Sequence, residues 1–264
     1  NPENAKKLID TGVTGIAYET VTSSDGSMPL LAPMSTIAGQ LAFVVGSYHL
    51  LKHNNGKGVM IGQMDNIDPR VVTVIGAGVS GTQSILKAID NNALVKVVDS
   101  SQSKLDELKL QYGSNNVEYI LSTKDSIQSS INDSDLVIGS VYVVGKEAPK
   151  VITKEMLSSM NPGTVMVDVS IDQGGCFETS KPTTHDNPTF LENEIVHYCV
   201  TNMPGAVPLT ATEALNKVTL SYIEYIANNG VSNALDSDEH LMNGLNIKDG
   251  TIIHPAVKEA LSRL

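Results

Sequence analysis

The feature that most constrains the fold of this chain is a glycine-rich turn at residues 76–81, which reads Gly-Ala-Gly-Val-Ser-Gly. A β-branched apolar run at residues 71–75 leads directly into this G-x-G-x-x-G spacing, and residues 82–88 favour a helix. A strand, a tight glycine turn and a helix in this order are typical of the first unit of a dinucleotide-binding, doubly wound parallel sheet. We therefore expect an α/β fold of the Rossmann type.

Each glycine of the turn has a mechanical role in such a site. Gly76 permits the tight turn, Gly78 lets the backbone approach a pyrophosphate, and Gly81 lets the helix pack closely on the strand. Asp99 lies 18 positions after Gly81, at the end of a second apolar run at residues 94–98. Its carboxylate would accept hydrogen bonds from ribose hydroxyls and repel a 2′-phosphate, which favours NAD over NADP. An ordinary glycine-rich turn or a methyltransferase-type nucleotide site remains the alternative.

The composition excludes several classes of partner. A formal net charge of −11 argues against nucleic acid or an anionic membrane surface, because both require clustered Lys and Arg. A hydrophobic content of 41% with 18% charged residues is typical of a soluble globular protein. Cys176 and Cys199 have no metal-ligand spacing, so we interpret them as reduced thiols of a cytoplasmic protein. We expect no metal site and no serine nucleophile, because neither motif is present.

An uncharged stretch at residues 26–51 raises the question of a membrane helix. Its polar side chains, among them Gln40 and His49, argue against insertion, because each would need a partner in hydrocarbon. We expect a buried helix at about residues 35–53 instead, capped by Ser35 or Thr36 and stopped at residues 54–56.

The remaining chain alternates between strands and helices, as a parallel sheet covered on both faces requires. Besides residues 71–75 and 94–98, we expect strands at 13–21, 117–121, 135–139, 164–170 and 194–200. Helices are expected at residues 2–9, 104–112, 125–131, 154–160 and 211–228, followed by short helices in the tail.

Two polar residues follow late strands, where ligands of open α/β sheets bind. Asp172 could contact a nicotinamide ribose or handle a substrate proton, or it could only cap the next turn. Asn202 offers a donor and an acceptor to a small ligand, but Asn before a Pro-Gly turn is also common in structural roles.

The histidines carry no clear chemistry. We expect His49 to satisfy a local hydrogen bond, His185 to lie in a polar loop and His197 in a strand. Surface positions are expected for His53, His240 and His254.

Taken together, these segments resemble the alanine dehydrogenase family, a group that includes the NAD-binding part of proton-translocating transhydrogenase. The run Ile171-Asp172-Gln173-Gly174-Gly175-Cys176-Phe177-Glu178-Thr179 is the most specific match. Further matching segments are residues 12–21, 30–35, 76–81, 135–139, 182–186, 197–200 and 202–208. The resemblance extends over nearly the whole chain.

The resemblance implies reversible, NAD-dependent oxidative deamination of L-alanine to pyruvate and ammonia by a homo-oligomer, usually a hexamer. It implies that Asp172 is the catalytic carboxylate and that Asn202 lies beside the nicotinamide and substrate. It also implies a cofactor lining of Ser35, Gly76, Gly78, Val79, Ser80, Gly81, Asp99, Lys104, Ser122, Val141, Tyr142, Val169, Lys181 and Met203. Residues 1–30 and 210–264 would then be parts of a substrate domain, and residues 31–209 the NAD-binding domain.

Two departures from the family pattern qualify this prediction. The family's substrate-binding Arg and Lys and its catalytic His are expected before residue 1, so we expect the chain as given to bind NAD but to turn over poorly. Leu209 stands where the family commonly has Arg, and Lys217 where it usually has Asn. Two alternatives stay open: the soluble NAD(H) domain of a transhydrogenase, and a cofactor-binding protein without catalysis.

Overall fold

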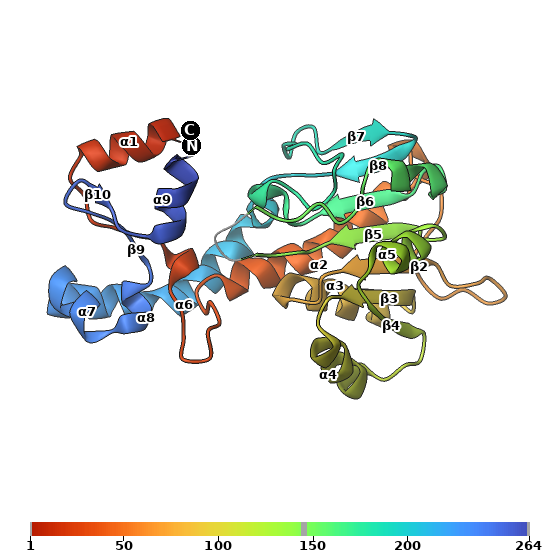
Figure 1. The fold of residues 1–264 in the computed structure, drawn as a ribbon. Helices are drawn as coiled ribbons and strands as arrows, with labels where there is room; N and C mark the ends of the chain where they lie inside the picture. The colour runs from red at the N-terminus through yellow and green to blue at the C-terminus, as the bar shows by residue number, and fades with distance from the viewer. Residues whose placement is uncertain (1, 144–146, 263–264) are drawn as a thin grey trace. The chain divides into compact units, whose positions relative to one another are not determined.

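A seven-stranded sheet forms the centre of the larger of two compact units, Ser35–Ala206 (Figure 1). The computed structural model describes residues 2–143 and 147–262. The strands are β2 Val71–Ile75, β3 Leu94–Asp99, β4 Val117–Leu121, β5 Leu136–Gly139, β6 Val165–Asp168, β7 Thr189–Glu192 and β8 Ile195–Tyr198. Their order is β4-β3-β2-β5-β6-β8-β7, with β7 antiparallel at one edge and the other neighbours parallel. From β2 the successive strands β3 and β4 are added on one side, and from β5 onward they are added on the other side. The boundary between the parallel strands β2 and β5 is thus the switch point at which such folds bind ligands.

Two hydrophobic cores, one on each face, hold the helices against this sheet. Alternate strand residues such as Val72 and Val74 pack with α2 Ala32–His49, α3 Val79–Asp90 and α4 Gln102–Tyr112. On the other face, residues such as Val137 pack with α5 Lys124–Ile131 and the 3₁₀ turn η3 Glu155–Ser159. Helices on both faces of a mostly parallel sheet confirm the predicted doubly wound α/β fold.

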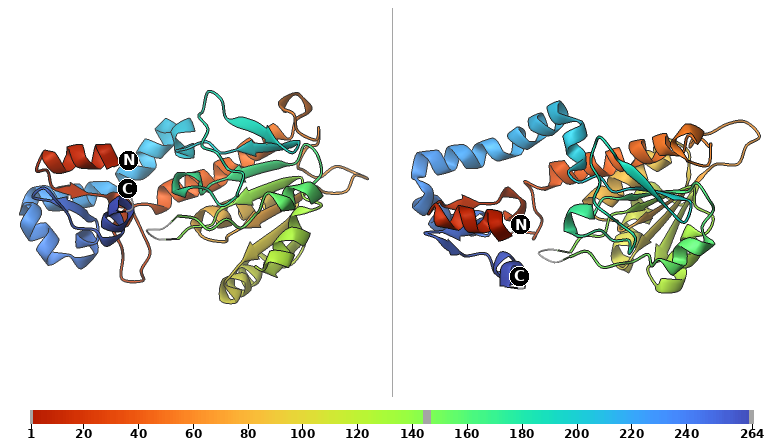
Figure 2. Two further views of the ribbon diagram at one scale, coloured as in Figure 1. Left: turned by 45° about the horizontal axis from the view of Figure 1, so that its top comes forward. Right: turned by 90° about the horizontal axis from the view of Figure 1, so that it is seen from above.

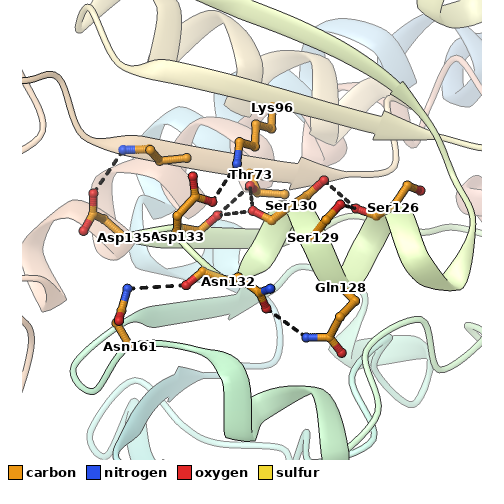
Figure 3. A network of polar contacts seen from close by, with 12 residues as sticks. Thr73, Lys96, Ser126, Gln128, Ser129, Ser130, Asn132, Asp133, Asp135 and Asn161 are labelled. Carbon is orange, nitrogen blue, oxygen red and sulfur yellow. Dashed lines mark hydrogen bonds and ion pairs between the residues drawn. The ribbon is translucent and has the colours of Figure 1, made fainter.

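A polar network ties the connection between α5 and β5 to the amino-terminal side of the sheet (Figure 3). The Thr73 hydroxyl lies 2.7 Å from that of Ser134, and Lys96 pairs with Asp133 at 2.6 Å. Lys57 and Asp135 form a largely buried ion pair at 2.9 Å. These contacts lie on the amino-terminal side of the parallel strands, whereas ligands bind beyond their carboxyl ends. They therefore hold the sheet and α5 together rather than contact a ligand.

The second unit, Asn1–Met34 with Val207–Leu264, has a small core of its own. Its sheet has the order β1-β9-β10, with β1 Gly15–Ile16, β9 Leu245–Lys248 and β10 Thr251–Ile252, all antiparallel. Its helices are α1 Pro2–Asp10, α6 Pro208–Asn229, α7 Val231–Ser237, α8 Glu239–Met242 and α9 Pro255–Ser262 (Figure 2). Val21, Leu235 and Leu241 are buried in its core. Across the two described ranges, no helix is both long and apolar enough to cross a membrane.

The predicted strand at residues 13–21 is wrong. Only Gly15–Ile16 pairs with β9, and the chain then turns into the 3₁₀ segment η1 Tyr18–Thr20. Because β9 offers pairing partners to these two residues alone, the β-rich composition of the rest of the segment has no ladder to join.

The long helix also differs from its prediction at both ends. It begins at Ala32, because Pro33 fits the first turn of a helix, where its missing N–H is not needed. It ends at His49, after which Leu51 is extended and η2 Lys52–Asn54 follows. Nor is it buried all round: Ala42 is inaccessible, whereas Val44 is 53% exposed.

Two further elements differ from their predicted type or length for local reasons. The segment predicted as a helix at residues 154–160 is the 3₁₀ turn η3. The strand expected at residues 194–200 is the shorter β8, because Asn193 and Glu194 take left-handed conformations, with φ of 49° and 59°. They form a hairpin turn to β7, which the sequence analysis did not predict.

Candidate functional site

The glycine turn joins β2 to α3 at the switch point of the sheet. An ideal Cβ on Gly76 would lie 2.3 Å from the Ser140 carbonyl oxygen, and Gly76 has a φ of 92°. A Cβ on Gly81 would lie 1.8 Å from the Gly76 carbonyl oxygen. Around Gly78, by contrast, no atom of the described residues other than Gly78 and its two chain neighbours lies within 4 Å of such a Cβ. Two glycines are therefore required for packing, whereas the third leaves the backbone open to an approaching ligand.

The start of α3 completes this cradle. Gly78 is the N-cap and has no side chain with which to bond the first-turn N–H groups. Val79 and Ser80 form that first turn, and Val79 is half exposed. The free N–H groups and the helix dipole at this point suit an anionic group such as a pyrophosphate.

Asp99 lies at the end of β3 and braces the glycine turn. One carboxylate oxygen accepts a hydrogen bond from the Ala77 N–H at 2.6 Å, and the other accepts from Ser101 N–H at 2.8 Å. The Ser122 N–H donates to the Asp99 carbonyl at 2.8 Å, which brings the end of β4 to the same point. Lys104, one turn into α4, pairs with Glu107 at 3.1 Å.

The carboxyl end of β6 holds a buried carboxylate that is not among the residues predicted from the sequence for this site. Asp168 is inaccessible and accepts hydrogen bonds from the N–H groups of Ser170 at 3.0 Å and Cys176 at 2.8 Å, and from the Ser180 hydroxyl. These bonds fold residues 169–180 back over the strand end. The signal was present in the sequence, since a lone acid within an apolar strand needs buried partners.

Asp172 and Asn202 meet at this carboxyl edge. Asp172 lies in η4 Ile171–Gln173, and Asn202 immediately precedes η5 Met203–Ala206. The Asn202 N–H donates to an Asp172 carboxylate oxygen at 3.3 Å, and both residues are exposed. The Asn202 carbonyl in turn lies 3.2 Å from the ring Nε2 of His185. The structure therefore joins the two predicted strand-end residues and adds His185 to them.

The other predicted cofactor residues are spread over neighbouring segments. Val141 and Tyr142 follow β5, Val169 follows β6, Met203 is buried, and Ser35 lies in the first turns of α2. Ser170 donates its hydroxyl to the Val141 carbonyl at 2.8 Å, which links two of these segments. Lys181 contacts β7 instead, with Nζ 3.8 Å from Glu192 and 5.2 Å from the centre of the Phe190 ring.

The buried thiols and His197 do not present reactive groups. Burial, and then the nearby Asp168 carboxylate, raise the pKa of the Cys176 thiol, and the same causes raise the pKa of Cys199 to about 12. Burial lowers the pKa of His197, whose Nε2 lies 2.8 Å from the Thr179 hydroxyl. Both thiols are therefore protonated and the imidazole is neutral near pH 7.

The histidines differ in their surroundings, and the local hydrogen bond expected for His49 is not seen at its Nδ1. Among the described residues, His49 Nδ1 is buried without a hydrogen-bond partner, because the ring packs against Tyr48 and Tyr198. His240 and His254 are partly exposed, in keeping with the expected surface positions. The His240 ring lies 3.1 Å from the Thr22 hydroxyl, whereas His254 Nδ1 is buried and has no partner in the described part of the chain. Within residues 2–143 and 147–262, no three His, Cys, Asp or Glu side chains gather closely enough to hold a metal ion.

Comparison with known proteins gives a consistent result. The model of the family "Alanine dehydrogenase/PNT, C-terminal domain" matches residues 42–255. Alanine dehydrogenase of Halomonas elongata is 48% identical over 97% of this chain and 68% of its own length. That of Mycolicibacterium smegmatis is 43% identical over 96% of this chain and 68% of its own length.

Solved structures agree. One described as an L-alanine dehydrogenase superposes with a TM-score of 0.92 and 41% identity, covering 99% of this chain and 72% of that structure. A transhydrogenase from Sinorhizobium meliloti superposes with a TM-score of 0.78 at 21% identity, covering 96% of this chain and 72% of that structure, which shows a shared fold.

Proposed function

The chain belongs to the family of the alanine dehydrogenase/PNT C-terminal domain, and from this premise we propose that it catalyses the reversible, NAD-dependent oxidative deamination of L-alanine to pyruvate and ammonia. One structural observation supports the proposal most strongly. The glycine cradle at β2 and the Asp172–Asn202 pair both lie at the carboxyl ends of strands of one sheet. The identity of up to 48% to proteins named alanine dehydrogenase supports the choice of substrate.

The cofactor is a nicotinamide dinucleotide, and we propose NAD. Its pyrophosphate would rest against Gly76, Gly78 and the first turn of α3, where only the Gly78 position leaves room for an incoming group. Asp99 supports NAD, because a carboxylate at this position accepts bonds from ribose hydroxyls and repels a 2′-phosphate. When bound, the cofactor supplies the acceptor for the hydride that leaves the alanine Cα.

Asp172 is the group of this chain that we propose for proton transfer. Its carboxylate is exposed, and the Asn202 N–H steadies one of its oxygens at 3.3 Å. Oxidation of the amine gives an imine, which must gain water and lose ammonia to become pyruvate. A carboxylate beside the substrate can take a proton from that water and return it to the departing nitrogen. The Asn202 side chain would meet the polar end of the substrate or the carboxamide of the cofactor.

The transhydrogenase structure, at 21% identity, supports a shared fold alone. We propose a homo-oligomer, with a hexamer expected from the resemblance, and a cytoplasmic location. We also propose that both chain ends contribute to a substrate domain. Light scattering of the purified protein would measure the number of subunits.

The proposed reaction is tested with the protein expressed from its natural gene. We expect NADH oxidation only when pyruvate and ammonium are both present; no oxidation with both would refute the function. Asp172→Asn should lower kcat by about 10²- to 10⁴-fold, because a positioned acid–base group contributes that much. Asp90→Asn, at an exposed site at the end of α3, is the matched control and should leave kcat unchanged.

A further inference from the structure

We propose that His185 is a positioning residue of this site, which holds the left-handed backbone of Asn202 in place and, through the Asn202 N–H, the Asp172 carboxylate. The inference rests on the proposed function for its kinetic consequence, but the contact itself stands on the geometry of the chain.

Asn202 is the point at which three segments meet. It has a φ of 52°, in the left-handed region that Asn tolerates better than most residues. Its N–H donates to Asp172 at 3.3 Å, and its carbonyl accepts from the Gly205 N–H at 2.9 Å. The second lone pair of the same carbonyl faces His185 Nε2 at 3.2 Å. The N–H and the carbonyl of Asn202 belong to the two peptide units on either side of its Cα. The bonds to the carbonyl therefore restrain the backbone torsions of Asn202 and help to hold the left-handed conformation in which its N–H meets Asp172.

The loop that carries His185 is fixed by contacts before and after His185 along the chain. Thr183 forms a parallel bridge with Val200, and its N–H donates to the Cys199 carbonyl at 2.8 Å. The Thr183 hydroxyl reaches forward to the Pro188 carbonyl at 2.9 Å, which closes the loop. His185 is exposed, but these contacts fix the backbone that carries its imidazole beside the turn after β8.

The chemistry fixes the direction of the contact. A carbonyl oxygen only accepts, so His185 must donate from Nε2–H to Asn202. Both the imidazolium and the neutral tautomer with hydrogen on Nε2 can donate this bond, and a Gln side chain carries an N–H at a similar reach. An apolar side chain of similar size carries none. Loss of the donor would leave the Asn202 carbonyl with the Gly205 N–H alone. The left-handed Asn202 would then be held less firmly, and the bond from its N–H to Asp172 would weaken.

The test compares His185→Leu with His185→Gln, and uses His53→Leu as the control at another exposed histidine. In His185→Leu we expect kcat for pyruvate and ammonium to fall by about 3- to 10-fold, the value of one hydrogen bond, while the Kd for NADH changes less than twofold. His185→Gln should recover most of kcat, and His53→Leu should match the unsubstituted protein. An unchanged kcat in His185→Leu, or an equal loss in both His185 variants, would overturn the proposal.

A second readout separates this proposal from the proposed function. Amide hydrogen exchange at Asn202, measured by NMR without substrate, should be faster in His185→Leu and restored in His185→Gln. If the unsubstituted protein shows no turnover of alanine, the proposed function fails, yet this exchange still tests the contact. Unchanged exchange in His185→Leu would show that the ring does not hold the Asn202 backbone.

Discussion

Substitution of Gly39 by Ala should damage the cofactor cradle from the helix behind it. Gly39 lies on α2, and an ideal Cβ there would be 2.0 Å from the Ser80 carbonyl oxygen and 2.8 Å from Ser80 Cα. These are backbone atoms of the first turn of α3, so they cannot rotate away. Carbon atoms pack at about 3.5–4.0 Å, so the two helices would have to separate by roughly 1 Å.

The magnitude follows from three effects. Overpacking of a tight contact costs about 1–3 kcal/mol, and the separation also strains the buried bond from the Ser84 hydroxyl to the Gly39 carbonyl, 2.7 Å long. A buried polar group that loses its partner costs about 1–3 kcal/mol. Ala gains about 1 kcal/mol over Gly in a helix interior. We expect a net fall of about 3 kcal/mol in the free energy of unfolding, together with weaker NADH binding, because the moved turn carries the phosphate-binding N–H groups.

Gly46→Ala on the same helix is the matched control. Its Cβ would meet the Leu136 side-chain methyl Cδ1 at 2.5 Å, an atom that can move, near the start of β5. Urea unfolding followed by circular dichroism measures stability, and the fluorescence of bound NADH measures affinity. We expect Gly39→Ala to lose at least tenfold in NADH affinity and Gly46→Ala to keep it. If both variants bind NADH as the unsubstituted protein does, the role assigned to the contact between α2 and α3 is wrong.

Three further predictions concern cofactor choice, stability and pH. Asp99→Asn should bind NADH more weakly, because the brace on Ala77 loses its charge, and its preference for NADH over NADPH should shrink; an unchanged ratio of Kd values would contradict the role. Lys57→Met should lower the free energy of unfolding by about 3 kcal/mol, because it leaves the largely buried Asp135 without its cation; a urea midpoint equal to that of the unsubstituted protein would oppose this. Burial lowers the pKa of His197, so the unfolded chain takes up a proton near pH 6.5 that the folded chain resists, and stability should fall as the pH drops below about 6.5. His197→Gln should show a smaller fall between pH 7.5 and 5.5 in urea unfolding, and an equal fall would count against the assignment.

The sequence predicted correctly those strands for which the local apolar pattern and the pairing with neighbouring strands favour the same structure. The apolar runs at β2 and β3 lie in the middle of the sheet, where β-branched residues are favoured by burial as well as by propensity. The strand expected at residues 13–21 failed because pairing depends on β9, more than two hundred residues away in sequence. The hairpin of β7 was missed because Asn193 and Glu194, rather than Gly, take the left-handed turn.

The candidate site was predictable in outline and not in its contacts. The rule that ligands bind beyond strand ends selected Asp172 and Asn202, and the structure places these two residues within hydrogen-bond distance of each other. The sequence indicates only that His185 lies in a polar loop, because the bridge between Thr183 and Val200 that brings it to Asn202 has no local sequence signal. The role of Asp99 as a brace for Ala77 was equally invisible, since it depends on the exact approach of two loops.

The most direct test of the proposed function follows the hydrogen of the alanine Cα. The protein expressed from its natural gene is incubated with NAD and L-alanine deuterated at Cα, and the reduced cofactor is analysed by mass spectrometry and NMR. The proposed reaction predicts one deuterium on the nicotinamide C4 of every NADH formed, and none when only the methyl group of alanine is deuterated. Pyruvate formed with no deuterium in the cofactor, or no NADH formed at all, would contradict it.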